Sequence, residues 1–522
     1  MSTGDELNVG GKGTDHQRFE AARLTRDARF DGIFLTAVRT TGVFCRSICP
    51  ARVPHKENVS YFLSATSALD NGYRPCLRCH PERAPAVPFL SPQFLVVRAL
   101  RAVREHRTMG SLDLSAVLNA TPEAIGTAFR SALQSTPSSA IRADRLLTAV
   151  WLLDEARLAI ATVAAATGFT STEALRSELG TVFGRAAARF EKCYGVGAGN
   201  GTDTKIRLPL AFRPPFSWAA STDFLSPRAT PGVESVDERG YSRTIQFNGI
   251  TGSINVTPTA GNHVNLVIDF PDHRFLCVIV ERVRRIFDLD ADPLAVGTCL
   301  AEDAALAPMV REYTGIRLVG AWDIFELVVR AILGQQVSVA TATALAGRLV
   351  AGFGKRVSAV GLLTHVFPTP DRLASARPSE FAMTRQRAEA IIALAKAVDS
   401  QSIKLESIAD PTNLERQLLS LPGVGPWTAR YAVIRGLSHP DTFLDTDLAI
   451  RKVTSELFPG ANRASLRRRI DAWRPWRSYA MIYLWKKYGL SRNRRSSART
   501  QLDSPLMTPR LRWTDESRWA PC

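Results

Sequence analysis

Residues 421–436 read LPGVGPWTARYAVIRG, and this stretch decides the fold of the carboxy-terminal part of the chain. A hydrophobic residue, Pro, Gly, a second hydrophobic residue and Gly separate two stretches of helical periodicity, which predicts two helices joined by a tight hairpin. Gly423 and Gly425 let the backbone come close to another group. The second helix begins directly after them, and the free N–H groups at its start favour an anion such as a phosphate.

An acidic residue follows this hairpin. Asp447 stands 22 residues after Gly425, at a predicted turn in FLDTDLAIRK. A hairpin of this type with a downstream aspartate resembles the helix-hairpin-helix superfamily of DNA glycosylases. The nearest resemblance is to AlkA-type 3-methyladenine-DNA glycosylases and covers about 205–489. It lies in VVRAILGQQVSVATATALA, FPTP, LPGVGPWTARYAVIRG and WRPWRSYAMIYLW, which stand in the family's order.

The AlkA resemblance implies roles for particular residues. Asp447 matches the catalytic aspartate and Asp445 is its competitor, while a plain helix N-cap is the structural alternative for Asp447. Gly423 and Gly425 would contact the DNA backbone. Gln336 would fill the space that a flipped base leaves, where the family prototype has Leu. The alternative for Gln336 is a surface residue at a helix end.

Three aromatic residues would line the pocket for the flipped base: Trp427, Tyr431 and Trp485. Cationic alkylpurines such as 3-methyladenine and 7-methylguanine should stack on these rings, although the alternative for each ring is an ordinary core aromatic. The carboxylate of Asp447 would stabilise the positive charge that develops on the sugar, and no cofactor is expected. Bifunctional members of the superfamily have a Schiff-base lysine at the position of Trp427, so we expect a monofunctional hydrolase.

Four cysteines form a second motif. Cys45 and Cys49 form C-x3-C, and Cys76 and Cys79 form C-x2-C after 26 intervening residues. Two close pairs supply the four thiolates that a tetrahedral zinc ion prefers. We therefore predict one Zn²⁺ held by all four sulfurs, and the alternative is four unrelated buried thiols.

The residues around these cysteines resemble the amino-terminal domain of Ada-type adaptive-response proteins, over about 19–83. The match lies in RTTGVFCRSICPAR, NVSYF and NGYRPCLRCHPER. It implies that Cys45, as a zinc-held thiolate, irreversibly accepts a methyl group from a DNA methylphosphotriester. It also implies DNA contacts at Thr41, Arg52 and Arg74, for which a solvated basic face is the alternative. Pro50 replaces an Arg of the prototype, which puts one backbone contact in doubt. The PCHR motif of the second Ada methyltransferase domain is absent, so repair of O6-methylguanine is not expected.

The stretch 91–194 has helical periodicity. Leu112–Leu133 and Ile160–Leu175 resemble the two helix-turn-helix units of AraC-type regulators. Polar residues of the second recognition helix are replaced by Ala, Leu and Glu, and the closing G-x-T-P signature is lost. The resemblance predicts a DNA-binding domain, and the alternative is a helical spacer without base readout.

Composition agrees with a nucleic-acid partner. The 522 residues carry a formal net charge of +17, which favours a polyanion over a neutral partner, although a solvated basic surface has the same composition. We recognise no signal peptide and no apolar run long enough to span a bilayer. We therefore expect no membrane partner, a cytoplasmic location and reduced cysteines.

The expected fold is multidomain α+β, with a small zinc-binding domain, an all-α AraC-type helix-turn-helix domain, a small α+β sheet domain and an all-α helix-hairpin-helix glycosylase domain. The expected boundaries are disordered 1–16, zinc domain 17–83, helix-turn-helix domain 91–194, linker 195–204, AlkA-type amino-terminal domain 205–315, glycosylase domain 316–489 and a basic disordered tail 490–522.

Two functions are expected from this set of domains. The first is DNA alkylation repair by base excision and single-use methyl transfer, coupled to transcriptional activation, with damaged double-stranded DNA, promoter DNA and RNA polymerase as partners. The alternative is mainly a methylation-sensing regulator with weak or vestigial glycosylase activity.

Overall fold

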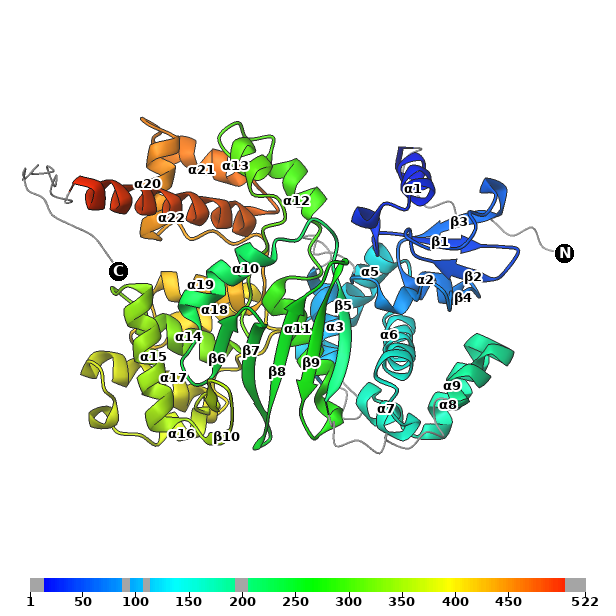
Figure 1. Ribbon diagram of the computed structural model, residues 1–522, viewed down its shortest axis with the longest axis horizontal. Helices are drawn as coiled ribbons and strands as arrows, with labels where there is room; N and C mark the ends of the chain where they lie inside the picture. The colour runs from blue at the N-terminus through cyan, green and yellow to red at the C-terminus, as the bar shows by residue number, and fades with distance from the viewer. Residues whose placement is uncertain (1–13, 87–93, 107–112, 193–204, 503–522) are drawn as a thin grey trace, which may run out of the picture.

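The structure is a computed structural model of the chain, and it describes residues 14–86, 94–106, 113–192 and 205–502. Four modules follow one another (Figure 1): a cysteine module (14–86), a helical module (94–192), a sheet module (205–323) and a hairpin module (324–502). In Figure 1 the cysteine and helical modules lie at one end of the molecule and the hairpin module at the other, with a five-stranded sheet between them.

The cysteine module is built on a four-stranded sheet of order β3-β1-β2-β4. Its elements are α1 (Thr14–Thr25), β1 (Leu35–Val38), β2 (Val43–Cys45), β3 (Val59–Phe62), α2 (Ala65–Asp70) and β4 (Arg74–Pro75). β2 ends on Cys45, and β4 leads directly into Cys76. Because β2 and β4 pair in parallel, with Phe44 opposite Pro75, the sheet brings these two cysteines to the same edge.

The helical module contains α3 (Phe94–Glu105), α4 (Leu114–Leu118), α5 (Pro122–Leu133), α6 (Pro137–Trp151), α7 (Ile160–Thr167), α8 (Thr172–Phe183) and α9 (Ala188–Lys192). The side chains of Thr121 and Ser171 cap the starts of α5 and α8. α7 ends at Gly168, where φ is +77°. The two stretches that resemble helix-turn-helix units therefore lie on α4–α5 and α7–α8, with α6 between them.

The sheet module has five antiparallel strands in the order β5-β9-β8-β7-β6. They are β5 (Ile206–Ala211), β6 (Glu234–Asp237), β7 (Gly240–Phe247), β8 (Ile250–Pro258) and β9 (His263–Asp269), accompanied by α10 (Trp218–Leu225), α11 (Leu276–Phe287), α12 (Pro293–Leu300) and α13 (Ala307–Glu312). One buried hydrophobic cluster runs from α6–α9 of the helical module into this sheet, so the two modules share a core.

The hairpin module contains α14 (Ile324–Leu333), α15 (Val339–Phe353), α16 (Pro370–Ala374), α17 (Arg385–Asp399), α18 (Pro411–Leu419), α19 (Pro426–Gly436), α20 (Leu448–Leu457), α21 (Arg463–Ala472) and α22 (Arg477–Leu502). The predicted hairpin joins α18 to α19. The module is not all helical as expected, because β10 (Arg356–Val360) and β11 (Leu363–His365) form a two-stranded hairpin. Gly361, with φ of +61°, permits its turn.

Two described helices extend past boundaries that were expected from the sequence. α1 begins at Thr14, inside the stretch 1–16 that was expected to be disordered, and α22 continues to Leu502, past the expected start of the tail at 490. Arginine is a good helix former, so a basic polar stretch does not by itself end a helix. The predicted linker 195–204 and the end of the tail, 503–522, lie outside the described residues. No described helix is long and apolar enough to cross a membrane.

Buried arginines of α3 dock the helical module onto its neighbours. Arg98 donates from Nε to the carbonyl of Ile408 at 2.6 Å, and Arg101 donates from Nη1 to the carbonyl of Leu437 at 2.9 Å. Arg101 also pairs with Glu281 of α11 at 3.2 Å. A buried cation is costly unless it is paired, so these contacts fix α3 in one position against the hairpin and sheet modules.

The exit of the cysteine module is held by Arg213 of the sheet module. Arg213 is fully buried and donates to the carbonyls of Pro85, at 3.2 Å, and Ala86. The N–H of Ala86 donates to Asp290 at 2.8 Å.

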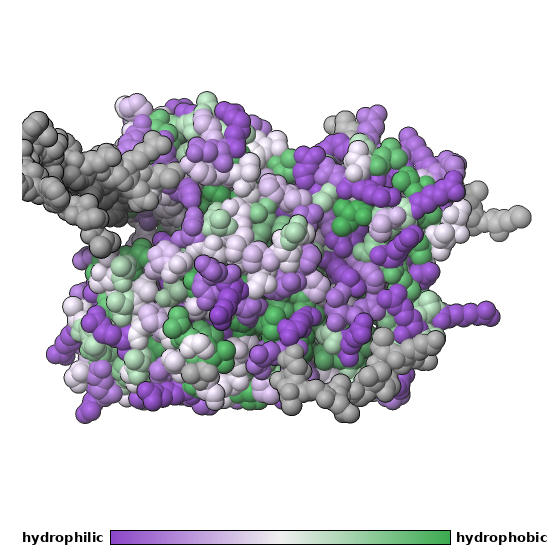
Figure 2. Space-filling view, viewed as in Figure 1, coloured by the Kyte–Doolittle hydropathy of each residue, from purple (hydrophilic) through white to green (hydrophobic). Residues whose placement is uncertain are grey.

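Hydrophilic residues lie over all the modules on the face drawn in Figure 2, and many of them cover the cysteine module.

Candidate functional site

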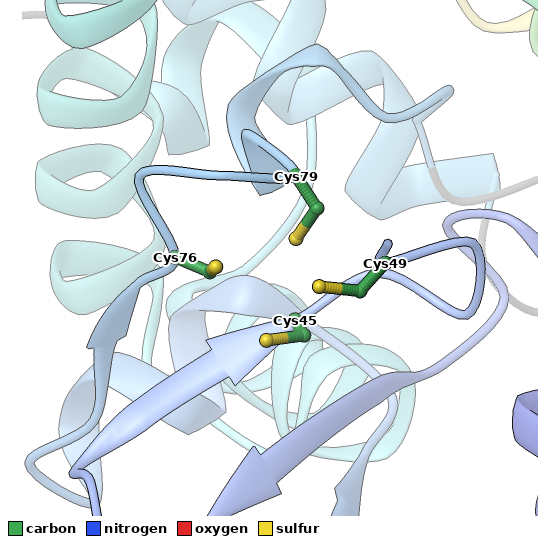
Figure 3. Close-up of side chains that lie close together, drawn as sticks. All are labelled: Cys45, Cys49, Cys76 and Cys79. Atoms are coloured by element: carbon green, nitrogen blue, oxygen red, sulfur yellow. The ribbon is translucent and has the colours of Figure 1, made fainter. Parts of the chain in front are cut away.

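The four predicted cysteine ligands come together at the edge of the small sheet (Figure 3). Cys45 ends β2, Cys49 lies in the following loop, and Cys76–Cys79 form a turn after β4. The four Sγ atoms lie within 4.8 Å of one another. Zn–S bonds of about 2.3 Å would place tetrahedral sulfurs about 3.8 Å apart, so the donor set fits a zinc ion.

The charges of this cluster also favour a cation. Hydrogen bonding to Cys45 lowers the pKa of Cys49 to about 7 and also lowers that of Cys76. Hydrogen bonding to Cys49 raises the pKa of Cys45, and hydrogen bonding to Cys45 raises that of Cys79. The thiols share protons in this way because adjacent thiolates repel one another. A divalent metal ion would allow all four to be thiolates.

Cys45 differs from its neighbours in the backbone groups around it. The N–H of Arg46 donates to Sγ of Cys79 at 3.4 Å, and the N–H of Ala51 bonds to Cys49. The N–H of Cys79 bonds to Cys76, so these three described N–H groups bond to the other three sulfurs and not to Sγ of Cys45. Because an N–H donor withdraws negative charge from a thiolate, Cys45 has the backbone surroundings expected of a nucleophile.

The three predicted DNA contacts of this module have different environments. Thr41, in the turn between β1 and β2, and Arg52, after Cys49, are exposed. Arg74 is half-buried and donates from Nη1 to the carbonyl of Pro75 at 3.3 Å. Thr41 and Arg52 are thus accessible to a partner, whereas Arg74 would have to reorient or extend from its present contact.

A charged group with no signal in the sequence fastens the Cys76–Cys79 turn to the helical module. Nδ1 of His80 lies 3.3 Å from Asp154, and this hydrogen bond is the main cause that raises the pKa of His80 to about 9. Arg189 of α9 pairs with Asp154 at 3.4 Å and donates to the carbonyl of Leu77 at 3.5 Å. The turn that carries two candidate ligands is therefore held by residues on either side of the second helix-turn-helix stretch, one before α7 and one in α9.

The hairpin turn has the geometry that its glycines permit. Gly423 has φ of +77°, and a Cβ there would lie 2.7 Å from Cβ of Ala390 in α17. Gly425 has open space around it and stands at the start of α19, where no side chain caps the helix. The free N–H groups of α19 are therefore available to an anion.

Asp447 makes the N-cap contact that was the structural alternative for it, and it also lies in the wall of a cavity. It is the N-cap of α20, and its Oδ1 accepts the N–H of Ile450 at 3.0 Å. Oδ2 accepts the indole N–H of Trp427 at 2.8 Å, and Oδ1 accepts that of Trp485 at 3.2 Å. The side chains of Asp447, Trp427 and Trp485 line a cavity of about 1060 Å³. The competitor Asp445 is exposed, forms an ion pair with Arg430 at 2.5 Å, and is not among the described residues that line this cavity.

The structure brings the three predicted pocket aromatics together around Asp447. The rings of Trp427 and Tyr431 are stacked, with centres 4.9 Å apart and planes 13° apart. Trp485 meets Tyr431 edge-on, with centres 6.5 Å apart. The cavity wall is thus an aromatic surface with one carboxylate in it.

Three residues of this cavity were missed in the sequence. Phe224 of α10 lies between two guanidinium groups, with Arg228 at 4.0 Å and Arg435 at 4.8 Å from its ring centre. Arg435 also donates to Oη of Tyr431 at 2.8 Å. Burial raises the pKa of Tyr431, but Arg435 and Arg228 outweigh burial and hold it below its ordinary value. Phe224 and Arg228 belong to another module, so local pattern alone could not place them here.

Gln336 lies beside the hairpin, in the loop between α14 and α15. It is exposed and has φ of +58°, a left-handed conformation that is uncommon for Gln. The neighbouring Gln335 donates to the carbonyl of Gly423 at 2.9 Å. This bond ties the loop of Gln336 to the hairpin.

Three family models match the chain. They are the metal binding domain of Ada at residues 18–82, the AlkA N-terminal domain at residues 207–323, and the HhH-GPD superfamily base excision DNA repair protein at residues 329–478. The Ada match contains all four cysteines, and the superfamily match contains the hairpin and Asp447. None of these three models matches the helical module, so its resemblance to AraC-type regulators remains a prediction.

Named relatives agree with these matches. DNA-3-methyladenine glycosylase 2 of Escherichia coli is 35% identical over 54% of this chain and 97% of its own length. The bifunctional transcriptional activator/DNA repair enzyme Ada of Escherichia coli is 53% identical over 14% of this chain and 20% of its own length. A probable bifunctional transcriptional activator/DNA repair enzyme AlkA of Mycobacterium tuberculosis is 37% identical over 90% of this chain and 96% of its own length. Because that likeness covers both the metal-binding domain and the glycosylase domain, the chain belongs to the AlkA family of bifunctional transcriptional activator/DNA repair enzymes.

Proposed function

We propose that this chain repairs alkylated DNA by two chemistries. The hairpin and sheet modules act as a monofunctional glycosylase that releases alkylated purines such as 3-methyladenine and 7-methylguanine. The cysteine module irreversibly takes methyl groups from methylphosphotriesters. The observation that carries the proposal is the carboxylate of Asp447 in the aromatic wall of a cavity beside the hairpin. The 3-methyladenine glycosylase among the relatives supports the choice of substrate.

Base excision needs a bound, extruded nucleotide. The hairpin at Gly423 and Gly425 with the N–H groups of α19 would hold the DNA backbone, and Gln336 would enter the space left in the stack. The cationic base would stack on Trp427 and Tyr431, with Trp485 closing the pocket. When the C1′–N bond breaks, the electron pair leaves with the base, and the carboxylate stabilises the positive charge on the sugar until water adds.

Strand cleavage is not expected. Trp427 occupies the position at which bifunctional members of the superfamily have a lysine. Lys486 is the lysine among the described residues that line the cavity, and its Nζ is held 3.4 Å from Asp223. We therefore assign hydrolysis without a covalent intermediate.

Methyl transfer is assigned to Cys45. Its sulfur would attack the methyl carbon in line, the C–O bond would break, and the phosphate diester would leave with the electron pair. Cys45, Cys49, Cys76 and Cys79 would hold one zinc ion, which keeps the sulfurs as thiolates at neutral pH. Thr41, Arg52 and Arg74 would contact the backbone around the lesion. The product is a thioether, so each chain reacts once.

Regulation is a second candidate function. α5 and α8 are the helices that would enter the major groove of promoter DNA, and RNA polymerase would be the further partner. The contact of His80 and Arg189 with Asp154 favours it, because it joins the cysteine site to the helical module. The alternative, a regulator with weak or vestigial glycosylase activity, keeps Cys45 as its sensor but gives no reason for a cavity with Asp447 in its wall.

One incubation separates the two chemistries. The chain is mixed with duplex DNA carrying labelled methyl groups, and released bases and protein-bound label are measured together. We expect both, with Asp447→Asn losing base release alone and Cys45→Ala losing protein-bound label alone. Base release that survives Asp447→Asn would exclude Asp447 as the catalytic group, and label on Cys45→Ala would exclude Cys45 as the acceptor.

A further inference from the structure

Both oxygens of the Asp447 carboxylate are engaged by tryptophan side chains. Trp427 reaches Oδ2 from α19 at 2.8 Å, and Trp485 reaches Oδ1 from α22 at 3.2 Å. The N–H of Ile450 adds a third donor to Oδ1 at 3.0 Å. A carboxylate held by donors on both oxygens cannot rotate without breaking a bond, so its direction is fixed by three separate elements.

These donors match a carboxylate better than a carboxylic acid. An ionised carboxylate accepts three N–H bonds, but a protonated carboxyl must turn one oxygen into a donor and lose a partner.

We propose that Trp427 and Trp485 are positioning residues whose indole N–H groups hold Asp447 as a fixed anion beside the sugar. This inference rests on the proposed glycosylase function and gives the tryptophans a task beyond base stacking. In it Asp447 acts by its charge and not as a proton acceptor. Water adds to C1′ after the base has left, and the proton of that water goes to solvent.

The described charged side chains at the cavity have partners other than Asp447, and Arg317 donates to backbone carbonyls. Arg435 is turned to Tyr431 and to the carbonyls of Val319 and Gly320. Arg330 pairs with Glu234 and Glu326, and Lys486 pairs with Asp223. Arg228 lies over the ring of Phe224. Arg430 pairs with Asp445 and Glu415 outside the cavity. Among the described residues, the hydrogen bonds to the Asp447 carboxylate thus come from neutral N–H groups.

The test is the pH dependence of base release. Single-turnover release from methylated duplex DNA is measured at pH 4.5 and pH 7.5 for the full chain and for Trp427→Phe and Trp485→Phe. Phenylalanine keeps an aromatic face but lacks the donor. The ratio of the two rates cancels the loss of stacking, which acts at both pH values. For Trp427→Phe we expect the rate at pH 4.5 divided by the rate at pH 7.5 to fall up to about tenfold, because the variant lacks a donor that only the ionised carboxylate can accept without losing a partner. The ratio should fall less for Trp485→Phe, because the bond from Trp485 to Oδ1 is longer than that from Trp427 to Oδ2. The N–H of Ile450 also still donates to Oδ1 in that variant.

A matched control exists in the same module. The indole of Trp473 donates to Oδ2 of Asp303 at 2.8 Å, in a buried setting that does not line the cavity. Trp473→Phe should leave the ratio unchanged. Methyl uptake by Cys45 in each variant reports that the chain is folded, and Trp485→Phe carries the test if Trp427→Phe does not fold.

Two results would overturn different statements. If Trp427→Phe and Trp485→Phe lower the rates at both pH values in parallel, the indoles only pack and stack, and the inference is wrong. If the unaltered chain releases no base at either pH, the proposed glycosylase function itself is wrong.

Discussion

At the scale of single residues, Asp447 combines an N-cap bond with two bonds from indole N–H groups. Its N-cap bond to Ile450 can be read from a sequence, because Asp before a helical stretch is a common cap. The two indole bonds cannot, since Trp427 and Trp485 come from helices that meet Asp447 only in the folded chain. The family resemblance therefore named the pocket aromatics, but not the bonds from their indole N–H groups to the carboxylate.

This arrangement predicts an energetic coupling between Asp447 and Trp427. In Asp447→Asn the side-chain amide can keep one oxygen on Ile450, but its NH₂ group then faces the indole N–H of Trp427. Two opposed donors cost about 1–3 kcal/mol. We expect Asp447→Asn to lower the free energy of unfolding by that amount in the natural chain and by much less in Trp427→Phe. A double-mutant cycle in urea measures this, and additive effects would contradict it.

At the scale of elements, the hairpin was predicted correctly because backbone geometry requires a glycine at position 423. Gly423 takes a positive φ with another chain segment against it, whereas Gly425 has an ordinary φ of −93° and open space. The two glycines of LPGVG therefore suit their positions for different physical reasons. The β10–β11 hairpin and the continuation of α22 to Leu502 were missed, because short strands and basic helices lack a distinctive hydrophobic period.

The two hairpin glycines should respond differently to alanine. Gly423→Ala forces a Cβ to within 2.7 Å of Ala390 and strains the backbone, so it should lower the melting temperature and DNA affinity together. Gly425→Ala should fold normally and weaken DNA binding alone, since its Cβ would stand where a phosphate approaches. Thermal melts and binding to an abasic duplex distinguish the two, and equal melting temperatures for both variants would count against this account.

At the scale of the whole molecule, sequence predicted the order of the modules but not their joining. Linkers rich in proline and glycine mark where a domain ends, but they do not say whether the next domain packs against it. The structure joins the modules by side chains that look like ordinary surface residues in the sequence. Arg98, Arg101 and Arg213 are examples, and each is buried and donates to a backbone carbonyl of another module.

The joint between α3 and the hairpin module should be sensitive to pH. His439 packs edge-on against Phe94, with ring centres 5.0 Å apart, and burial lowers its pKa to about 4. An unfolded histidine titrates near 6.5, so the folded chain favours the neutral ring. The resulting stability is fully present above pH 6.5 and is lost as pH falls toward 4, by at most about 3 kcal/mol.

His439→Asn should flatten this dependence. The amide can still bond to Thr442, the present partner of Nδ1 at 2.8 Å, but it does not titrate. Denaturant unfolding between pH 7.5 and pH 4.5 provides the comparison. The same pH slope in both proteins would show that other groups dominate the acid sensitivity.

The bonds of α3 to the hairpin module and of Arg213 to the cysteine module keep both candidate sites in one folded chain. Under the proposed function Cys45 is consumed by one methyl group, whereas Asp447 is restored after every base. Because both belong to one joined body, a chain with a spent sulfur remains a working excision enzyme. Dividing cells would then inherit, in the ratio of alkylated to unaltered chains, a record of past exposure that outlasts the lesions themselves.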